Sequence, residues 1–364
     1  MPYQIQHNTT THYPALDGLR GLSLCAILLH HNFNYHGIFE IFWISVDIFF
    51  ALSGFLITDL LLKKREGKNF LANFYTRRLL RIFPLYYISL FLFFYIIPAI
   101  IKYPFNIGLF LKNQIWFWTY LQNWFIIFNY EHNNGFLDHF WTLAIEEQFY
   151  IIWPCIILLL RSIQKITTFL LASMLIIFTA RITIWCFQFD QLNYAALYKF
   201  TRVDGLLIGS LLALVRIDNS FFLRLIDKLL ISALLFSAGI ILPILKILFH
   251  FKLAYTACCI YPFVGLLGGF AVNFTLNGKN FLYNLLTQPY LRFIGKISYG
   301  LYIFHWPIYK LLMGKFSTPL QPGGSTFFTS FLIPLSSTIL TLIAAIISYY
   351  CIESPFLKLK KYFT

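Results

Sequence analysis

The sequence is poor in charge. Asp, Glu, Lys and Arg make up only 12% of its 364 residues, while hydrophobic residues make up 59% and aromatic residues 20%. A soluble domain carries about 25% charged residues, so this composition excludes a soluble globular fold. The apolar runs reach about 20 residues, the length that a helix needs to cross a bilayer, and short alternating segments of the β-barrel kind are missing. The predicted fold class is therefore an all-α, polytopic membrane helix bundle.

Further absences narrow the function. The six cysteines and the His, Asp and Glu residues lack ligand spacing for zinc, so no metal site is predicted. No G-x-S-x-G motif surrounds Ser53, which we expect to pack between helices or to line a site. The net charge of +14 is not accompanied by a soluble basic domain, so no nucleic-acid partner is predicted. Residues 1–13 hold no Lys or Arg, so the first apolar run is expected to be retained rather than cleaved as a signal peptide.

About ten membrane spans are predicted within a single domain, residues 1–364. The predicted spans are 14–33, 42–62, 82–101, 143–160, 166–187, 200–216, 229–248, 255–275, 297–313 and 328–350. With the N-terminus inside, 18 of the 28 Lys and Arg fall in inner segments, so the positive-inside rule places both termini in the cytoplasm. Residues 106–128 are also apolar, but they hold Lys112 and several amides, and a crossing there would reverse this bias. They are predicted to form an interfacial or re-entrant segment.

Two ionisable residues lie in the first predicted span. Arg20 stands near the start of the stretch DGLRGLSLCAILLHHN, residues 17–32, and His31 near its end. Eleven residues are about three helical turns, or roughly 16 Å, so both side chains lie on nearly the same helix face. Ionisable groups are costly in a bilayer and usually line a path or a site. The pair is therefore predicted to be functional, and His30, about 100° round the helix, is not.

A basic cluster, Arg77, Arg78 and Arg81, precedes the third predicted span. Their three- and four-residue spacing places them near one another on a helix. Guanidinium groups bind phosphate oxygens in a forked geometry, so the cluster could hold a polyphosphate. An ordinary cytoplasmic cluster that touches anionic lipid headgroups is the competing interpretation.

Acidic residues gather at the entrance of the fourth predicted span. The stretch DHFWTLAIEEQFYIIWP, residues 138–154, contains Asp138, His139, Glu146 and Glu147. Carboxylates here could bind sugar hydroxyls or orient a histidine, because an ionised carboxylate accepts strong hydrogen bonds. Pairing with an arginine to fix helix packing is the alternative.

Other polar residues in predicted spans are candidates for substrate contacts. Asp47 lies near the outer end of the second span, and Arg202 and Asp204 lie at the start of the sixth. Arg202 and Asp204 are two residues apart and cannot face each other on a helix, so each is expected to find partners on other helices. His305 lies in the ninth span, where a hydrogen-bonded structural role competes with a chemical one.

Taken together and in order, these motifs resemble the integral-membrane acyltransferase 3 family. The resemblance extends over essentially the whole chain. It is carried by LDGLRG with an arginine eleven residues before a histidine, DIFFALSGFLIT, FYTRRLLRIFPLYY, FWTLAIEEQFYIIWP, RVDGLLIGS, GKISYGLYIFHWPIY and YYCIESPF. One departure is Thr142, which stands where the family pattern usually has serine.

The resemblance implies an O-acetyltransferase in a bacterial cytoplasmic (inner) membrane. Its donor would be cytoplasmic acetyl-CoA, and its acceptor a surface glycan such as lipopolysaccharide O-antigen or a polyprenyl-linked sugar. Arg20 and His31 match the family's essential arginine and histidine, Glu146 matches the carboxylate of its SLxxExQFY-like pattern and is a further catalytic candidate, and the basic cluster matches its basic motif. Asp47, Glu147, Arg202, Asp204 and His305 are candidate substrate contacts. The expected form is a stand-alone one without an extra hydrolase-like domain.

A rival from another class is a transporter or flippase of an acylated or polyprenyl-linked glycan, which would also place charges and aromatic walls inside the membrane. It predicts movement of the glycan without a new ester. Inverted repeats of the transporter kind are not apparent in the sequence, which disfavours it.

Overall fold

The computed structural model describes residues 12–103, 107–128, 135–186, 201–217, 256–276, 281–316 and 328–363. Within these ranges every regular element is helical. The predicted all-α class is therefore confirmed. The seventh predicted span, 229–248, lies outside the described residues.

The first half of the chain supplies the helices that surround the centre of the bundle. These are α1 (Pro14–Phe33), η1 (Asn34–Ile44), α2 (Ser45–Lys64), α3 (Phe70–Phe91), η2 (Leu92–Ile96), α4 (Ile97–Ile100), α5 (Gly108–Lys112), α6 (Ile115–Trp118), α7 (Gln122–Phe128), α8 (Phe140–Leu160) and α9 (Ile163–Cys186).

The second half adds helices on both sides of that centre. These are α11 (Asp204–Ile217), η5 (Thr256–Ile260), α15 (Tyr261–Leu276), α16 (Phe281–Leu286), α17 (Pro289–Lys296), α18 (Ser298–Phe316), η6 (Phe328–Leu332), α19 (Ile333–Ser348), η7 (Tyr349–Glu353), α20 (Ser354–Lys358) and η8 (Leu359–Tyr362).

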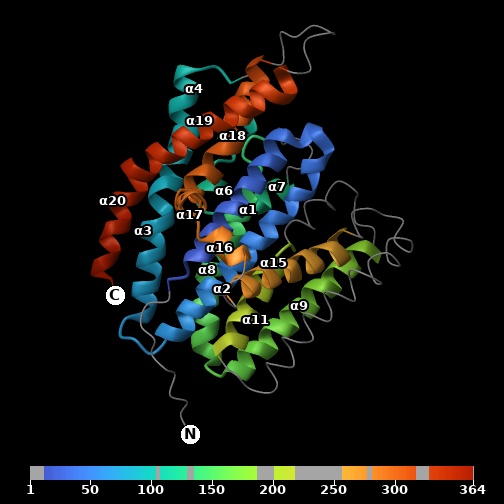
Figure 1. The fold of residues 1–364 in the computed structure, drawn as a ribbon, viewed down its shortest axis with the longest axis vertical. Helices are drawn as coiled ribbons and strands as arrows, with labels where there is room; N and C mark the ends of the chain where they lie inside the picture. Colours follow the sequence, from blue (N-terminus) through green and yellow to red (C-terminus); the bar gives the residue numbers. More distant parts are fainter. Residues whose placement is uncertain are drawn as a thin grey trace.

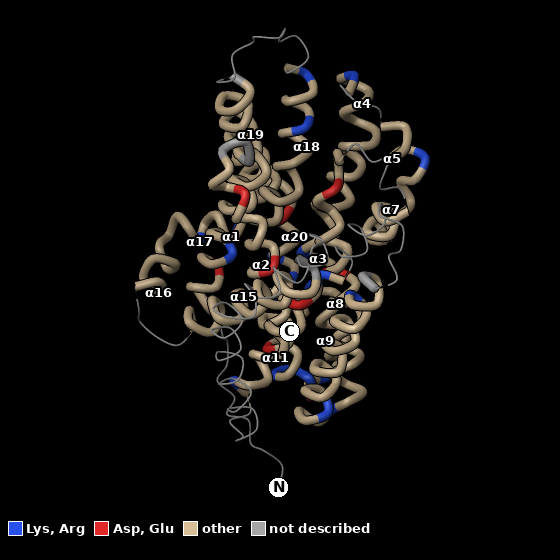
Figure 2. The backbone as a smooth tube through the Cα atoms, turned by 90° about the vertical axis from the view of Figure 1, so that its right-hand side faces the viewer, with Lys and Arg blue, Asp and Glu red and all other residues tan. Residues whose placement is uncertain are grey.

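The bundle has two flanks and a shared centre (Figure 1). Helices α9, α11 and α15 form one flank, and α3, α19 and α20 form the other, with α1, α2 and α8 between them. Helix α2 packs against α11, α15, α1 and α8, and α18 packs against α19 and α1. Charged residues lie inside the bundle, near α2, α3 and α8, as well as at its ends (Figure 2).

Glycines let the central helices touch backbone to backbone. A Cβ atom on Gly209 of α11 would lie 2.0 Å from the carbonyl oxygen of Ala51 in α2. On α1, a Cβ on Gly21 would lie 2.3 Å from the carbonyl oxygen of Leu291 in α17. Small residues drive such close packing in membranes, where lipid offers no hydrophobic gain. Gly21 thus lies on the face of α1 that contacts α17, and the neighbouring Arg20 lies about 100° round the helix from that face.

Six helices in the described part of the chain are long and apolar enough to cross a membrane. They are Gly37–Lys64, Phe70–Ile100, Phe140–Leu160, Ile163–Ile184, Cys258–Leu276 and Thr329–Tyr362. The protein is thus an integral membrane protein, as predicted. The first predicted span, 14–33, coincides with α1, which is not among these six.

The third predicted span begins too late in the sequence. Helix α3 starts at Phe70 rather than at residue 82. The basic cluster was predicted to precede this span, and it lies instead within helix α3. Charged side chains lower the hydropathy of these first three turns, although the spacing of the arginines is helical.

Residues 107–128 do not form a continuous span. They break into α5, α6 and α7, and Tyr120 between the last two adopts a positive φ of 55°. The amide of Gln122 is buried and donates to the carbonyl oxygen of Phe140 at 2.8 Å. This agrees with the prediction that the segment is not a transmembrane helix.

Candidate active site

A partly open cavity lies at the centre of the bundle, between α1, α2, α3, α8 and α18, and its empty volume, with the space at its opening included, is about 750 Å³. We call it the central cavity. Its lining is Arg20, Ile27, Val46, Phe49, Phe50, Ser53, Arg78, Arg81, Ile82, Thr142, Leu143, Glu146, Glu147, Tyr150, Ser298, Tyr299 and Tyr302. Apolar walls with a few converging polar groups are typical of ligand sites.

Three arginines from two helices meet in the central cavity. Arg20 comes from α1, and Arg78 and Arg81 come from α3. Arg20 has a carboxylate nearby, with 3.6 Å between its Nη1 and Oδ1 of Asp17 on the same helix. Arg78 and Arg81 form no ion pair within 4 Å in the described part of the chain; Arg78 instead lies over the ring of Tyr150 at 5.4 Å. The cavity therefore holds guanidinium groups that are available to an anionic ligand.

Arg77, the third member of the basic cluster, lies outside the cavity lining. Its Nη1 donates a hydrogen bond of 3.0 Å to the carbonyl oxygen of Phe363 near the C-terminus. Helix spacing does not decide this division, because Arg77 lies about 40° and Arg78 about 60° from Arg81 around the helix axis. The hydrogen bond to Phe363 holds Arg77 outside the cavity. The sequence alone did not show which two of the three arginines face inward.

Two carboxylates from α8 also line the cavity. Oε1 of Glu146 accepts a hydrogen bond of 2.8 Å from Oγ of Ser53, and Glu147 lies next to it in the chain. Both glutamates are buried. Ser53 lines the cavity, which is one of the two roles expected for it. Glu146 is hydrogen-bonded to Ser53, and His31 is hydrogen-bonded to His305. A contact in which the Glu146 carboxylate orients the His31 imidazole is therefore not among these hydrogen bonds.

Three histidines lie beyond one end of the central cavity. His31 follows the lining residue Ile27 by one turn on α1. His305 likewise follows Tyr302 by three residues on α18, and His139 precedes Thr142 by three residues. We call His31, His139 and His305 the histidine cluster.

The histidine cluster is held by close polar contacts. Nδ1 of His31 is 2.8 Å from Nε2 of His305, and the ring centroids of His139 and His305 are 4.9 Å apart. The hydroxyl of Tyr302 donates to the carbonyl oxygen of His139 at 2.8 Å and is 2.6 Å from the hydroxyl of Thr142. Within the described residues, no group of three His, Cys, Asp or Glu side chains could hold a metal ion.

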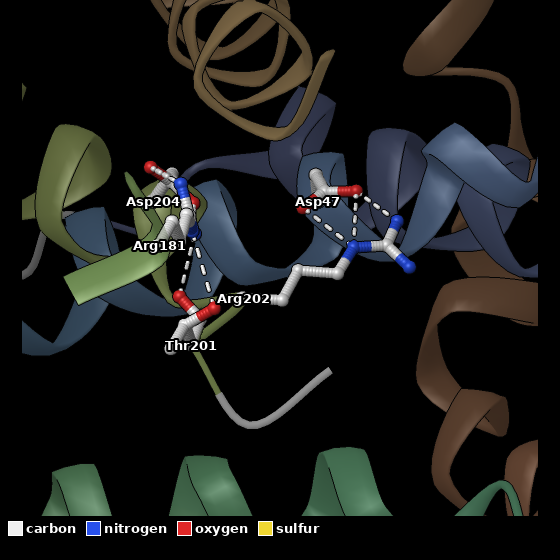
Figure 3. A network of polar contacts seen from close by, with 5 residues as sticks. All are labelled: Asp47, Arg181, Thr201, Arg202 and Asp204. Atoms are coloured by element: carbon white, nitrogen blue, oxygen red, sulfur yellow. Dashed lines mark hydrogen bonds and ion pairs between the residues drawn. The ribbon is translucent and has the colours of Figure 1, made fainter. Parts of the chain in front are cut away.

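Four other buried charges form a separate group, the charge-pair network. Arg202 binds Asp47 with its Nε and Nη2, and Nη2 also donates to the carbonyl oxygen of Trp43 at 3.1 Å. Arg181 donates to Asp204 at 3.1 Å and to the carbonyl oxygen of Thr201 at 2.6 Å (Figure 3). The network thus joins α2, α9 and the start of α11.

The structure therefore separates the predicted substrate contacts. Glu147 lines the central cavity, and His305 lies next to it in the histidine cluster. Asp47, Arg202 and Asp204 lie in the charge-pair network and not in the cavity lining. Arg202 and Asp204 do find their partners on other helices, as predicted from their two-residue spacing. Arg181, which showed no evident partner in the sequence, is the partner of Asp204.

Sequence reasoning missed three residues at one end of the cavity, two of which, Thr142 and Tyr302, line it. His139, Thr142 and Tyr302 were not assigned to the site, yet they link α8 to α18 between the cavity and His31. The available signal was the spacing: Tyr302 and Thr142 each lie three residues from a histidine and so share its helix face. What could not be seen is that the two faces meet, since they are 160 residues apart in the chain.

The fold and the cavity define an integral-membrane helix bundle with a polar, arginine-lined internal site. The chain belongs to the acyltransferase domain family, whose sequence pattern matches residues 13–350. The resemblance to membrane acyltransferases is thereby confirmed.

Named relatives agree with this assignment. A putative peptidoglycan O-acetyltransferase of Bacillus subtilis is 32% identical over 374 residues, which is 98% of this chain and 56% of the relative. The peptidoglycan O-acetyltransferase of Listeria monocytogenes is 31% identical over 318 residues, covering 82% of this chain and 49% of the relative. A putative O-acetyltransferase of Staphylococcus aureus is 29% identical, covering 95% and 57%.

This chain spans about half the length of these curated relatives. No solved structure matches it.

Proposed function

We propose that the protein is a membrane O-acetyltransferase that moves an acetyl group from acetyl-CoA to a hydroxyl group of an extracytoplasmic glycan. The two relatives named for peptidoglycan favour peptidoglycan, or its lipid-linked precursor, as the acceptor over lipopolysaccharide O-antigen. The proposed location is the cytoplasmic membrane, with both termini inside, which follows from the distribution of Lys and Arg among the loops.

One observation carries the proposal: a single cavity holds three arginines, two of them without an ion-pair partner among the described residues. Both guanidinium groups are partly buried, and even partial burial without a counter-ion is costly, so such a site suits a ligand that brings negative charge. The phosphates of coenzyme A supply that charge, and guanidinium groups bind phosphate oxygens with strong, forked hydrogen bonds. Arg78 and Arg81 would hold the phosphates, with Arg20 beside them.

The rest of the cavity fits the remainder of the donor. Ile27, Val46, Phe49, Phe50 and Leu143 offer an apolar wall to the pantetheine arm and the acetyl group. Because Arg20 and His31 lie on nearly the same face of α1, about 16 Å apart, a donor held at the arginines would extend along α1 toward the histidine. The residues present therefore fit an acyl-CoA.

His31 is the proposed catalytic base. Its imidazole would take the proton of the acceptor hydroxyl as the oxygen forms a bond to the acetyl carbon. The carbon–sulfur bond then breaks, and the imidazolium returns the proton to the departing thiolate of coenzyme A. A transient acetyl-imidazole on His31, formed and then attacked by the acceptor, gives the same net reaction.

The test replaces His31 in a strain that lacks the chromosomal gene. His31→Ala should reduce glycan O-acetylation by at least about 1,000-fold, since it removes the base and any acyl carrier. The measurement is mass spectrometry of muropeptides, together with quantification of the protein in membranes. His30→Ala is the matched control, because His30 neighbours His31 but contacts the carbonyl oxygen of Phe39, and it should retain acetylation. An active His31→Ala protein would contradict the assignment.

A further inference from the structure

His305 is the member of the histidine cluster that contacts His31. It is fully buried on α18, and its ring lies between those of His31 and His139. The planes of the His31 and His305 rings differ by only 7°, with centroids 5.0 Å apart. Nearly coplanar rings place the hydrogen bond between them in the plane of the nitrogen lone pairs, which is the favourable direction.

The backbone fixes which nitrogen of His305 carries the proton. Nδ1 of His305 is 2.7 Å from the carbonyl oxygen of Tyr302. A carbonyl oxygen can only accept, so Nδ1 of His305 must be the donor. In a neutral imidazole the other nitrogen, Nε2, then has a lone pair and no proton.

The direction of the next hydrogen bond follows. Nε2 of His305 is 2.8 Å from Nδ1 of His31. Since Nε2 of His305 can only accept, Nδ1 of His31 must donate. The remaining nitrogen of a neutral His31, Nε2, is therefore unprotonated and able to take a proton.

Burial favours the neutral form of this pair. His305 is 0% exposed and is surrounded by His31, His139 and Tyr302 rather than by a carboxylate. A positive charge in this environment would lack a counter-ion, at a cost of several kcal/mol. Trp306 packs against the His31 ring, with centroids 4.9 Å apart, and limits its rotation.

We propose that His305 is a positioning residue that holds His31 in the tautomer with a free Nε2. This rests on the proposed role of His31 as base. The chain runs from the carbonyl oxygen of Tyr302 through His305 to Nδ1 of His31. When Nε2 of His31 takes the hydroxyl proton, the hydrogen bond to His305 stabilises the resulting imidazolium until the proton passes to the thiolate. The arrangement performs with a backbone carbonyl and a neutral imidazole what a carboxylate does for the histidine of hydrolase triads.

The experiment compares three purified variants in lipid nanodiscs. His305→Phe keeps a ring but removes the acceptor, and should lower kcat about 100-fold while leaving KM for acetyl-CoA within about twofold. His305→Gln keeps an acceptor for His31 Nδ1 and should recover at least about tenfold of that loss. Tyr86→Phe is the matched control: Tyr86 is equally buried and loses one hydrogen bond, to the carbonyl oxygen of Phe117, but it lies outside the histidine cluster and the cavity lining, and it should change kcat by less than about threefold.

A spectroscopic signature separates positioning from packing. Nitrogen-15 NMR of histidine-labelled protein distinguishes the two neutral tautomers, with assignment by loss of a signal in His31→Ala. We expect the Nδ1–H tautomer of His31 in the native protein and a shift toward Nε2–H in His305→Phe.

Three results would overturn the proposal. They are a His31 that is Nε2–H in the native protein, a folded His305→Phe protein with native kcat, or a His305→Gln protein no better than His305→Phe. The first needs no variant at His305, so the proposal stays testable if His305→Phe does not fold. An active His31→Ala protein would instead refute the proposed function itself, and the two failures are thus distinct.

Discussion

Two groups of charged residues lie inside the same bundle, one buried and one partly buried, and they differ in how their charges are neutralised. In the charge-pair network, Arg202 is paired with Asp47 and Arg181 with Asp204, and the guanidinium groups also bind backbone carbonyls. In the central cavity, Arg78 and Arg81 face an empty volume and form no ion pair with a described residue. Paired buried charges connect helices, whereas buried charges without partners indicate a ligand.

The aromatic side chains around the arginines also differ between the charge-pair network and the central cavity. Arg202 lies over the rings of Trp43 and Tyr261, at 4.6 and 4.9 Å, so its planar faces are covered as well as its edges. Such packing leaves no room for a substrate. In the cavity, Arg78 lies over the rings of Phe74 and Tyr150 at 5.7 and 5.4 Å, and Arg20 over that of Phe49 at 5.9 Å, but Arg78 and Arg81 have no carboxylate within 4 Å among the described residues.

The largest effect is expected from breaking a pair in the charge-pair network. Arg202→Met should lower the free energy of unfolding by about 3–5 kcal/mol, because Asp47 is then left charged and buried without a partner. The measurement is denaturant or thermal unfolding of the purified protein in detergent. Arg216→Met, at the exposed end of α11, should change it by less than about 0.5 kcal/mol.

A double variant tests whether Arg202 and Asp47 stabilise the protein as a pair. Adding Asp47→Leu to Arg202→Met removes the unpaired carboxylate, so the double variant should be more stable than Arg202→Met alone. If the two single losses simply add, the pair is not the stabilising unit that the contacts indicate.

In the cavity we expect a smaller effect, which changes the binding of acetyl-CoA and not the stability of the protein. Arg78→Gln combined with Arg81→Gln should raise KM for acetyl-CoA about 100-fold, through loss of two charge-assisted hydrogen bonds, without lowering the free energy of unfolding. Arg77→Gln is the matched control and should change KM by less than about threefold, since Arg77 contacts the backbone of Phe363. Equal effects of Arg77→Gln and the double variant would show that the cluster acts only as a group of basic residues at the membrane surface.

Local spacing predicted much of this molecule. The bounds of α1, the shared face of Arg20 and His31, and the need of Arg202 and Asp204 for partners on other helices all follow from periodicity and from the cost of buried charge. Each is a property of one segment.

The features that could not be predicted depend on contacts between segments far apart in the sequence. The bond between Arg202 and Asp47 joins residues 155 positions apart, and that between His31 and His305 joins residues 274 apart. Helix rotation about its axis is set by backbone contacts such as that of Gly209 with Ala51, and no single segment contains that information. The choice of Arg78 and Arg81 over Arg77 was undetermined for the same reason.

The most direct test of the account measures which part of the donor the cavity recognises. Calorimetry should compare coenzyme A with pantetheine, which has the same arm but no phosphates, on the native protein. If the arginines of the central cavity bind phosphate, coenzyme A should bind about 100-fold more tightly, and the difference should disappear in the Arg78→Gln, Arg81→Gln protein. Equal affinities of the native protein for the two compounds would contradict the proposal that the arginines of the central cavity bind the phosphates of coenzyme A.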